Sequence, residues 1–232
     1  MGTKQNILVV GAGFAGATIA RELADNDYKV TVIEKRNHIG GNAYDYVNEH
    51  GILIHKYGAH IFHTSNETVF KYLSRFTDWI EYKHKVRAML GDGSTISFPP
   101  TKTFVEKFGT HFTKKVFYTP YTKKMWGVEI DESIINRVPL RDDDGELYFP
   151  KDKYQYLPKQ GYASLFNNML SHANINVLLN TEFNKDMEVE YDHVFNSMPI
   201  DVYYDYRFGE LPYRSIKFTH VDLPFPRMSR NP

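Results

Sequence analysis

The first forty residues alternate between continuous apolar runs and one amphipathic stretch. Residues Ile7–Val10 form an unbroken apolar run, which is typical of a strand buried on both faces of a parallel sheet. A helix is predicted from about Phe14 to Ala24, and a second buried strand from Val30 to Ile33. This order of strand, tight turn, helix and strand predicts a βαβ unit at the start of the chain.

Later parts of the chain predict further elements of both kinds. Residues 66–76, "NETVFKYLSRF", repeat apolar side chains at helical spacing. The segments "HKVRAML" and "TISFP" flank Gly91-Asp92-Gly93, which indicates a hairpin. Residues 101–126 are expected to be helical, and residues 145–183 to hold strands around the helix "YASLFNNMLSHA". The segment "HVFNSMP" predicts a strand that returns to the parallel sheet, so the fold class is α/β.

Composition narrows the classes of function. The chain has 232 residues, enough for one large domain or two small ones. Lys+Arg and Asp+Glu are both 28, and this balance gives no support for a nucleic-acid or acidic-membrane partner. Cysteine is absent, which excludes disulfides and thiolate metal sites. The N-terminal apolar run is too short for a signal peptide or a membrane span, so a cytoplasmic protein is expected.

The turn after the first strand carries a dinucleotide signature. Gly11, Gly13 and Gly16 form G-x-G-x-x-G between the predicted strand and helix. The three glycines permit a sharp turn, a close approach of the backbone to a pyrophosphate, and close packing of helix on strand. Glu34 ends the second strand, where a carboxylate accepts hydrogen bonds from ribose hydroxyls. An acid at this position disfavours NADP, and NAD and FAD both stay open.

A second glycine pair favours FAD. Gly40–Gly41 follow the acid closely, with Asn42 next. The segment resembles the E-x3-5-GG segment of flavoproteins of the glutathione-reductase type, in which this backbone lies against the extended FAD. From "VIEKRNHIGGNAYDY" onward the chain resembles the UDP-galactopyranose mutase family. The motifs "PYTKKMWG", "IINRVPLR", "ELYFP", "YQYLPKQGYASLFNNML", "YDHVFNSMPID" and "YDYRFGELPYRSIKF" follow in the family's order and cover nearly the whole chain.

The resemblance implies a reaction without net redox change. These enzymes interconvert UDP-galactopyranose and UDP-galactofuranose. Reduced FAD is the nucleophile, because its N5 attacks the anomeric carbon and UDP leaves. The resulting adduct opens, recloses through a different hydroxyl, and UDP returns. The resemblance therefore implies reduced FAD as cofactor and UDP-galactose or UDP-galactofuranose as partners, and it is compatible with a homodimer.

The resemblance also assigns site residues by position. The residues that would line FAD, with the glycines of the turn, are Gly11, Gly13, Ala15, Gly16, Glu34, Lys35, Asn42, His60, Ile61 and Phe183. The residues that would bind substrate are His84, Tyr121, Thr122, Trp126, Arg137, Tyr148 and Arg214. Within the second set, Arg137 matches the family's diphosphate arginine, Tyr148 its phosphate-contacting tyrosine and Trp126 its tryptophan near galactose and flavin. Guanidinium donors suit a diphosphate leaving group.

Domain boundaries follow from the same comparison. We expect a Rossmann-like FAD-binding domain of residues 1–98 plus 186–206, and a short helical substrate subdomain of residues 99–140. Residues 141–185 plus 207–232 would form an additional antiparallel sheet. Family chains continue past "LPYRSIKFTHVDLPFP", so we expect an incomplete sheet domain with an exposed edge and an open flavin site. The activity of this chain by itself stays open, as do an FAD-dependent oxidoreductase and a non-catalytic FAD- or UDP-sugar-binding remnant.

Two segments look like metal sites and are interpreted otherwise. "HKYGAHIFHT" holds His55, His60 and His63, but no acidic or cysteine ligand stands at fixed spacing. The prediction is that the backbone near His60 faces the flavin, while the other two histidines are structural. The run Asp142-Asp143-Asp144-Gly145 suggests a calcium loop, but the twelfth position is Lys153 rather than glutamate. No metal is therefore expected.

Overall fold

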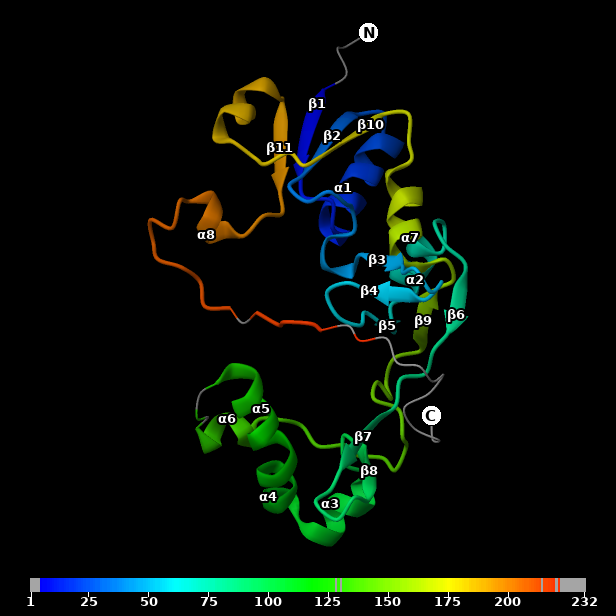
Figure 1. Ribbon diagram of the computed structural model, residues 1–232, viewed down its shortest axis with the longest axis vertical. Helices are drawn as coiled ribbons and strands as arrows, with labels where there is room; N and C mark the ends of the chain where they lie inside the picture. Colours follow the sequence, from blue (N-terminus) through cyan, green and yellow to red (C-terminus); the bar gives the residue numbers. More distant parts are fainter. Residues whose placement is uncertain (1–4, 128, 130, 214, 220, 222–232) are drawn as a thin grey trace.

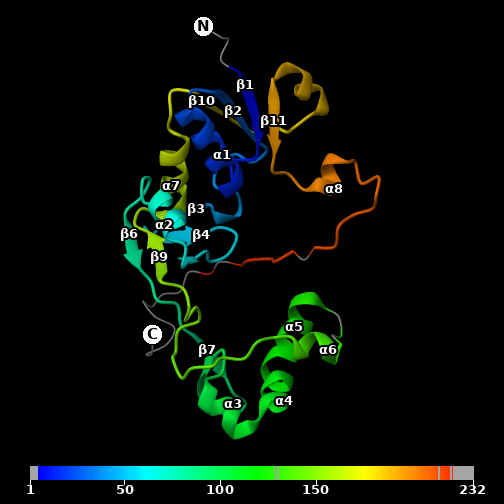
Figure 2. The same cartoon turned by 180° about the vertical axis from the view of Figure 1, so that it is seen from behind.

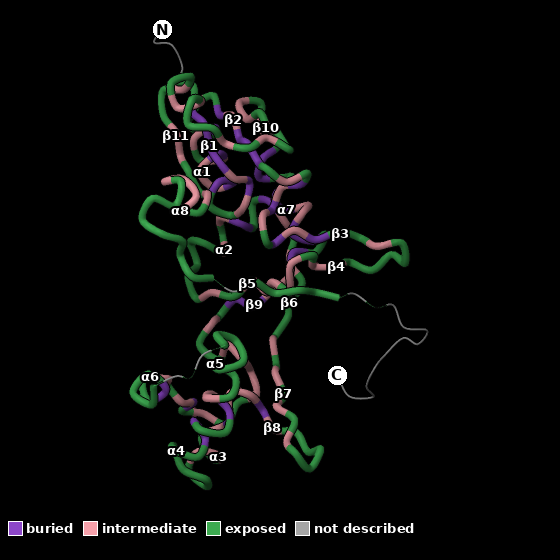
Figure 3. The backbone as a smooth tube through the Cα atoms, turned by 60° about the vertical axis from the view of Figure 1, so that its left-hand side comes forward, coloured by how far each residue is buried: buried purple, intermediate pink, exposed green. Residues whose placement is uncertain are grey.

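The computed structural model describes residues 5–127, 129, 131–213, 215–219 and 221. These residues form an upper region around a parallel sheet and a lower region of helices and one hairpin, joined by a narrow connection (Figure 1). Most buried residues lie in the strands and helices of the upper region (Figure 3). Among the described helices, none is long and apolar enough to cross a membrane.

The upper region is organised by a four-stranded parallel sheet. Its strand order is β10 (Ile175–Leu179), β2 (Lys29–Glu34), β1 (Asn6–Val10) and β11 (His193–Asn196). Leu8 of β1 lies opposite Thr31 of β2 and Val194 of β11. The predicted βαβ unit and the returning strand "HVFNSMP" are confirmed. The central strand β1 is buried on both faces, as its unbroken apolar run indicated.

Two helices cover one face of this sheet. Helix α1 (Phe14–Asp25) and helix α7 (Gly161–Leu170) pack against it together (Figure 2). Small buried residues of α1, among them Ala17 and Ala20, allow the close approach of Leu165 and Phe166 of α7. On the opposite face a smaller cluster forms around Leu8, with η3 (Lys185–Glu190) contributing Met187.

Smaller antiparallel sheets extend the upper region downward. Strands β3 (Asp45–Val47) and β4 (Leu53–His55) form a hairpin after the 3-10 turn η1 (Gly41–Ala43). Strand β9 (Tyr154–Pro158) pairs with both β5 (Phe62–Thr64) and β6 (Trp79–Glu81). Helix α2 (Glu67–Leu73) is shorter than the predicted span 66–76, because Ser74 caps it and Phe76 enters the core after the helix has ended. An additional antiparallel sheet is therefore present, but of its three strands β9 alone comes from residues 141–185.

The lower region begins with the predicted hairpin. Strands β7 (Val86–Met89) and β8 (Thr95–Phe98) pair around Gly91–Gly93, so this prediction is confirmed. The expected helical segment follows as α3 (Lys102–Phe108), α4 (Thr110–Thr113), the π-helical turn η2 (Lys114–Tyr118) and α5 (Thr119–Trp126). Helix α6 (Glu132–Asn136) closes the region. A short helix α8 (Ile200–Tyr203) lies apart, after β11.

A narrow neck joins the two regions. The chain leaves the upper region near His84 and returns near Tyr148, and the Tyr148 N–H donates to the His84 carbonyl at 2.8 Å. Lys85 and Leu147 form an antiparallel bridge beside this hydrogen bond. We define the neck as residues 84–85 and 147–148. The two crossings therefore lie side by side and act as one connection.

The domain boundaries differ from those expected in two places. Strand β10 and helix α7 belong to the parallel sheet and its cover rather than to a separate sheet domain of residues 141–185. The hairpin β7–β8 lies with the lower helices, where the Phe98 ring is 6.4 Å from that of Phe117 and 5.7 Å from that of Tyr118. The lower region thus comprises residues 85–147 rather than 99–140. Strand pairing and aromatic packing decide these boundaries, and neither follows from periodicity alone.

Candidate functional site

A groove opens at the carboxyl ends of β1 and β2, where open α/β sheets bind ligands. Its volume is ≈ 330 Å³. It takes in both glycine motifs, the end of β2 and the start of α8. The predicted cofactor residues that line it are Gly11, Gly13, Glu34, Lys35, Asn42 and Phe183.

The turn from β1 to α1 has the geometry of a phosphate site. Gly11 has φ +95°, and its N–H donates to the Ile33 carbonyl at 2.8 Å. Gly16 packs directly beneath this turn. The contact is so close that an added methyl group on Gly16 would overlap the Gly11 carbonyl oxygen. Gly13 caps α1 without a side-chain hydrogen bond, and the first turn of the helix holds no acid. The helix N-terminus therefore presents N–H groups and its positive end to the groove.

The second glycine pair lies against the first. Gly40 has φ +89°, and its N–H donates to the Ala12 carbonyl at 2.8 Å. A methyl group on Gly41 would stand 3.2 Å from the Gly13 Cα, so the two backbones are in near contact. The contacting residues of each pair, Ala12 with Gly40 and Gly13 with Gly41, are 28 residues apart in the sequence, and the two motifs form one wall. Such a bare backbone wall fits the flank of an extended dinucleotide.

Glu34 is fixed at the floor of the groove. It is 7% exposed, and its Oε2 accepts from the Ala12 N–H and its Oε1 from the Arg36 N–H, both at 3.0 Å. The carboxylate is thus held in one orientation. Each carboxylate oxygen has a second acceptor position, so the group can still bind ribose hydroxyls.

The groove also contains residues that sequence reasoning missed. Arg36 donates to Asn42 Oδ1 at 3.0 Å and lies over the Tyr57 ring at 4.6 Å. Its Nη1 is buried, with no hydrogen-bond partner among the described residues. Ser197 donates to the Val10 carbonyl at 2.6 Å from the strand on the other side. A basic residue two positions after the acid is a signal that could have found Arg36. The donor set, the acid and the bare glycine wall fit a dinucleotide.

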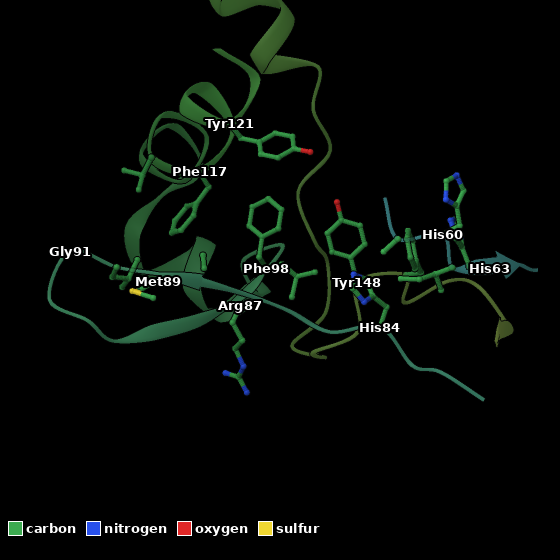
Figure 4. Close-up of a pocket in the computed structure, with 17 residues that line it drawn as sticks. His60, His63, His84, Arg87, Met89, Gly91, Phe98, Phe117, Tyr121 and Tyr148 are labelled. Atoms are coloured by element: carbon green, nitrogen blue, oxygen red, sulfur yellow. The ribbon is translucent and has the colours of Figure 1, made fainter. Parts of the chain in front are cut away.

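A second cavity of ≈ 830 Å³ lies where the upper and lower regions meet at the neck (Figure 4). Its upper wall is the segment after β4, and its lower wall is formed by β7, β8 and the helices. Of the predicted site residues, it brings together His60, Ile61, His84, Tyr121 and Tyr148. The hydroxyls of Tyr121 and Tyr148 point into the same space (Figure 4).

The three histidines of "HKYGAHIFHT" have separate environments. The His60 N–H donates to His55 Nδ1 at 3.1 Å, and His60 Nδ1 lies 2.8 Å from the Gly58 carbonyl. Because a carbonyl only accepts, the His60 ring is protonated on Nδ1. His63 Nδ1 lies 2.6 Å from Asp152 Oδ2, and its ring stacks on Phe149 at 3.6 Å. Within the described residues, no group of His, Cys, Asp or Glu side chains is placed to hold a metal ion.

Burial perturbs two ionisable groups of the second cavity, His84 and Tyr148. Burial lowers the pKa of His84, and the neighbouring His63 lowers it further. His84 Nδ1 is buried without a hydrogen-bond partner among the described residues. Burial also raises the pKa of Tyr148, with Tyr121 adding to the effect. At neutral pH His84 is therefore a neutral imidazole and Tyr148 a protonated phenol, and both are hydrogen-bonding groups without net charge.

The lowered pKa of His84 predicts a loss of stability in mild acid. Below the ordinary histidine value of 6.5 the unfolded chain takes up a proton that folded His84 resists. The contribution of His84 to stability is thus complete above pH 6.5. It is lost as the pH falls from 6.5 towards the lowered pKa of His84 in the folded protein. His84→Gln should flatten the free energy of unfolding measured by urea titration from about pH 7 to about pH 5. The exposed His111→Gln is the control, and equal slopes in all three proteins would contradict the prediction.

Several predicted residues lie outside both cavities. Ala15 is on the first turn of α1, and Gly16 is buried beneath the glycine turn. The Thr122 hydroxyl donates to the Tyr118 carbonyl at 2.7 Å inside the helix. Trp126 is 54% exposed at the end of α5, and Arg137 is exposed after α6. Arg214 lies outside the described residues.

Comparison with known proteins decides the family. A profile described as UDP-galactopyranose mutase matches residues 116–231, and one described as an NAD(P)-binding Rossmann-like domain matches residues 9–76. The "Probable UDP-galactopyranose mutase" of Klebsiella pneumoniae is 33% identical over 98% of this chain and 73% of its own length. This chain belongs to the UDP-galactopyranose mutase family. The relatives that match over most of this chain are named as mutases, which are isomerases.

Two further comparisons describe the breadth of the family likeness. The dTDP-fucopyranose mutase of Escherichia coli is 37% identical over 91% of this chain and 68% of its own length. A crystal structure of reduced UDP-galactopyranose mutase has a TM-score of 0.64, at 17% identity, over 85% of this chain and 56% of that chain. This structural likeness supports the fold. The chain spans little more than half the length of that solved mutase.

Proposed function

We propose that this chain interconverts UDP-galactopyranose and UDP-galactofuranose with reduced FAD as cofactor. The observation that carries the proposal is the pair of cavities. The chain has both a glycine-walled groove suited to a dinucleotide and a larger cavity lined by His60, Tyr121 and Tyr148. FAD in its reduced form would supply the flavin N5 as nucleophile toward the anomeric carbon.

The chain's own residues would hold and orient the cofactor. Glu34 would accept hydrogen bonds from ribose hydroxyls, and the N-terminus of α1 would bind the pyrophosphate. Lys35, Asn42 and Phe183 line the same groove. The backbone of His60 and Ile61, at the wall of the second cavity, would face the flavin ring.

The second cavity would hold the sugar nucleotide. Tyr148 and Tyr121 present hydroxyls as donors to phosphate oxygens, and His84 presents a neutral ring. Arg137, Trp126 and Thr122 are proposed as substrate residues on the family resemblance, and so is Arg214. A binding site for a diphosphate leaving group is completed best by a guanidinium, which stays charged as negative charge develops.

A dTDP-sugar is the second candidate substrate. The relative that acts on dTDP-fucopyranose is 37% identical to this chain. Both substrates share a pyrimidine nucleoside diphosphate leaving group, so both fit the same chemistry. They differ at the pyrimidine methyl, at the 2′-hydroxyl of the nucleoside sugar and in the hexose.

The test is an absorbance spectrum followed by a turnover assay. The purified protein should carry flavin absorbance, and after reduction by dithionite it should equilibrate UDP-galactofuranose with UDP-galactopyranose on a chromatogram. Parallel assays with dTDP-fucopyranose decide the second candidate. A flavin-loaded, reduced protein that converts neither sugar contradicts the proposal, and steady transfer of electrons to an acceptor without isomerisation would indicate an oxidoreductase.

Alanine substitutions of His60 and His63 should affect different properties of the protein, the first its function and the second its stability. His60→Ala is expected to slow the mutase step or weaken FAD binding by about tenfold, because the ring fixes the backbone at the cavity wall through Gly58. His63→Ala should instead lower the melting temperature, since His63 pairs with Asp152 and stacks on Phe149. Turnover, flavin retention and thermal unfolding of both variants check this. A silent His60→Ala would show that the ring is dispensable there.

A further inference from the structure

The acidic run Asp142–Gly145 is a folded turn whose carboxylates are used by the protein. Asp143 Oδ1 accepts from the Gly145 N–H at 2.7 Å. Asp144 accepts from the N–H and the hydroxyl of Thr103 at 2.8 and 2.9 Å, at the start of α3. These bonds hold the turn against the lower region. The acidic run therefore has a structural role.

The side chain of Arg141 lies at the centre of this turn. It is 2% exposed, and its Nη1 and Nη2 donate to the carbonyl oxygens of Gly145 and Leu147. Its Nε lies 3.8 Å from Asp143 Oδ1. A guanidinium is always charged, and burying it is unfavourable unless acceptors surround it. Its planar fork reaches two carbonyls of the same segment at once, which a lysine ammonium on a flexible stem does not match.

The clamped segment ends at the neck, where two cavity residues meet. Leu147, whose carbonyl binds Arg141, bridges to Lys85, and the next residue, Tyr148, donates its N–H to the His84 carbonyl at 2.8 Å. The Tyr148 ring lies edge-on to the His84 ring, with centroids 5.5 Å apart. The backbone position that Arg141 fixes is therefore the one from which the Tyr148 side chain enters the second cavity (Figure 4).

We propose that Arg141 is a positioning residue that holds Tyr148 and His84 at the second cavity by clamping the carbonyls of Gly145 and Leu147. The contacts of Arg141 with Gly145 and Leu147 support the clamp itself, and the expected effect of the clamp on substrate binding rests on the proposed function. Arg141 does not line the cavity itself, so its effect on substrate passes through Tyr148. Removing the fork should free the turn and let the Tyr148 hydroxyl move.

The first test is hydrogen exchange, which needs no substrate. In Arg141→Gln the amides of residues 145–149 should exchange about tenfold faster than in the unsubstituted protein, while those of β1 stay unchanged. Arg141→Lys should give an intermediate rate and replaces the first variant if that one fails to fold. Asp142→Asn is the matched control, because among the described residues this exposed neighbour forms a surface pair with Lys151 and no other ion pair. Unchanged exchange in residues 145–149 of the Arg141 variants would overturn the proposal.

The second test is a double-mutant cycle on UDP-galactose binding, measured by calorimetry. Arg141→Gln is expected to raise Kd about tenfold, and less than about twofold when Tyr148→Phe is already present. Equal losses in both backgrounds would overturn the action through Tyr148. If the unsubstituted protein neither binds nor converts sugar nucleotides, the proposed function fails, while accelerated exchange at 145–149 still supports the clamp.

Discussion

Replacing Gly16 by alanine is expected to lower the free energy of unfolding by about 3 kcal/mol and to abolish retention of a bound dinucleotide. The added methyl group would overlap the Gly11 carbonyl oxygen and would stand 3.2 Å from Val9 Cγ1. Both neighbours belong to the central strand and its turn, which have no room to retreat. Relief would require α1 to move away from the sheet, and the groove would lose its phosphate-binding geometry.

Chemical denaturation and the flavin spectrum of Gly16→Ala check this prediction. Gly91→Ala is the matched control for stability, since no atom of the described residues lies within 4 Å of a methyl group there. Its free energy of unfolding should change by less than about 0.5 kcal/mol. A Gly16→Ala protein as stable as the control would mean that α1 does not pack on the turn as closely as described.

Replacing Asp45 by alanine should also destabilise the protein by about 3 kcal/mol. Asp45 is 1% exposed, and its two oxygens accept from the N–H groups of Tyr162 and Ala163 at 2.6 and 2.7 Å. Asp45, on strand β3, thereby caps the N-terminus of α7. The helix's own N-cap residue, Gln160, makes no side-chain hydrogen bond there. Alanine would leave the N–H groups of buried Tyr162 and half-buried Ala163 without this partner at the positive end of the helix.

Urea unfolding of three variants separates this cap from an ordinary one. Asp45→Asn keeps one carbonyl oxygen as an acceptor. It should lower the free energy of unfolding by about half as much as Asp45→Ala. Asn66→Ala removes the exposed cap of α2, which accepts from Thr68 and Val69, and should cost about 1 kcal/mol. Equal effects of Asp45→Ala and Asn66→Ala would mean that burial adds nothing to the cap.

The sequence predicts well those elements whose signals are local. The strand at Ile7–Val10 and the hairpin at Gly91–Gly93 each follow from neighbouring residues, and both are confirmed. Assigning elements to regions was less successful. Strand β10 joins the parallel sheet by pairing with β2, about 145 residues earlier in the chain, and no local pattern encodes that partner.

The residues with assigned roles likewise fall into two groups, those with a local sequence signal and those whose partners are distant in the sequence. The wall of the groove could be predicted because G-x-G-x-x-G and Glu34 lie within one βαβ unit. Arg141 and Asp45 could not, because their roles depend on partners brought close by the fold, such as Tyr162, which is 117 residues from Asp45. Trp126 and Arg137 were assigned by resemblance, and their roles stay predictions.

The neck has a consequence for how this architecture can vary. Residues 85–147 form an insertion whose two ends are already paired, so the upper region is insensitive to the length between them. Each doubling of such a loop adds only about 0.6 kcal/mol of closure entropy. The lower region can therefore be enlarged, trimmed or exchanged between relatives without altering the register of the parallel sheet. Under the proposed function, recognition of the sugar nucleotide can diverge in that insertion while the glycine-walled groove keeps its form.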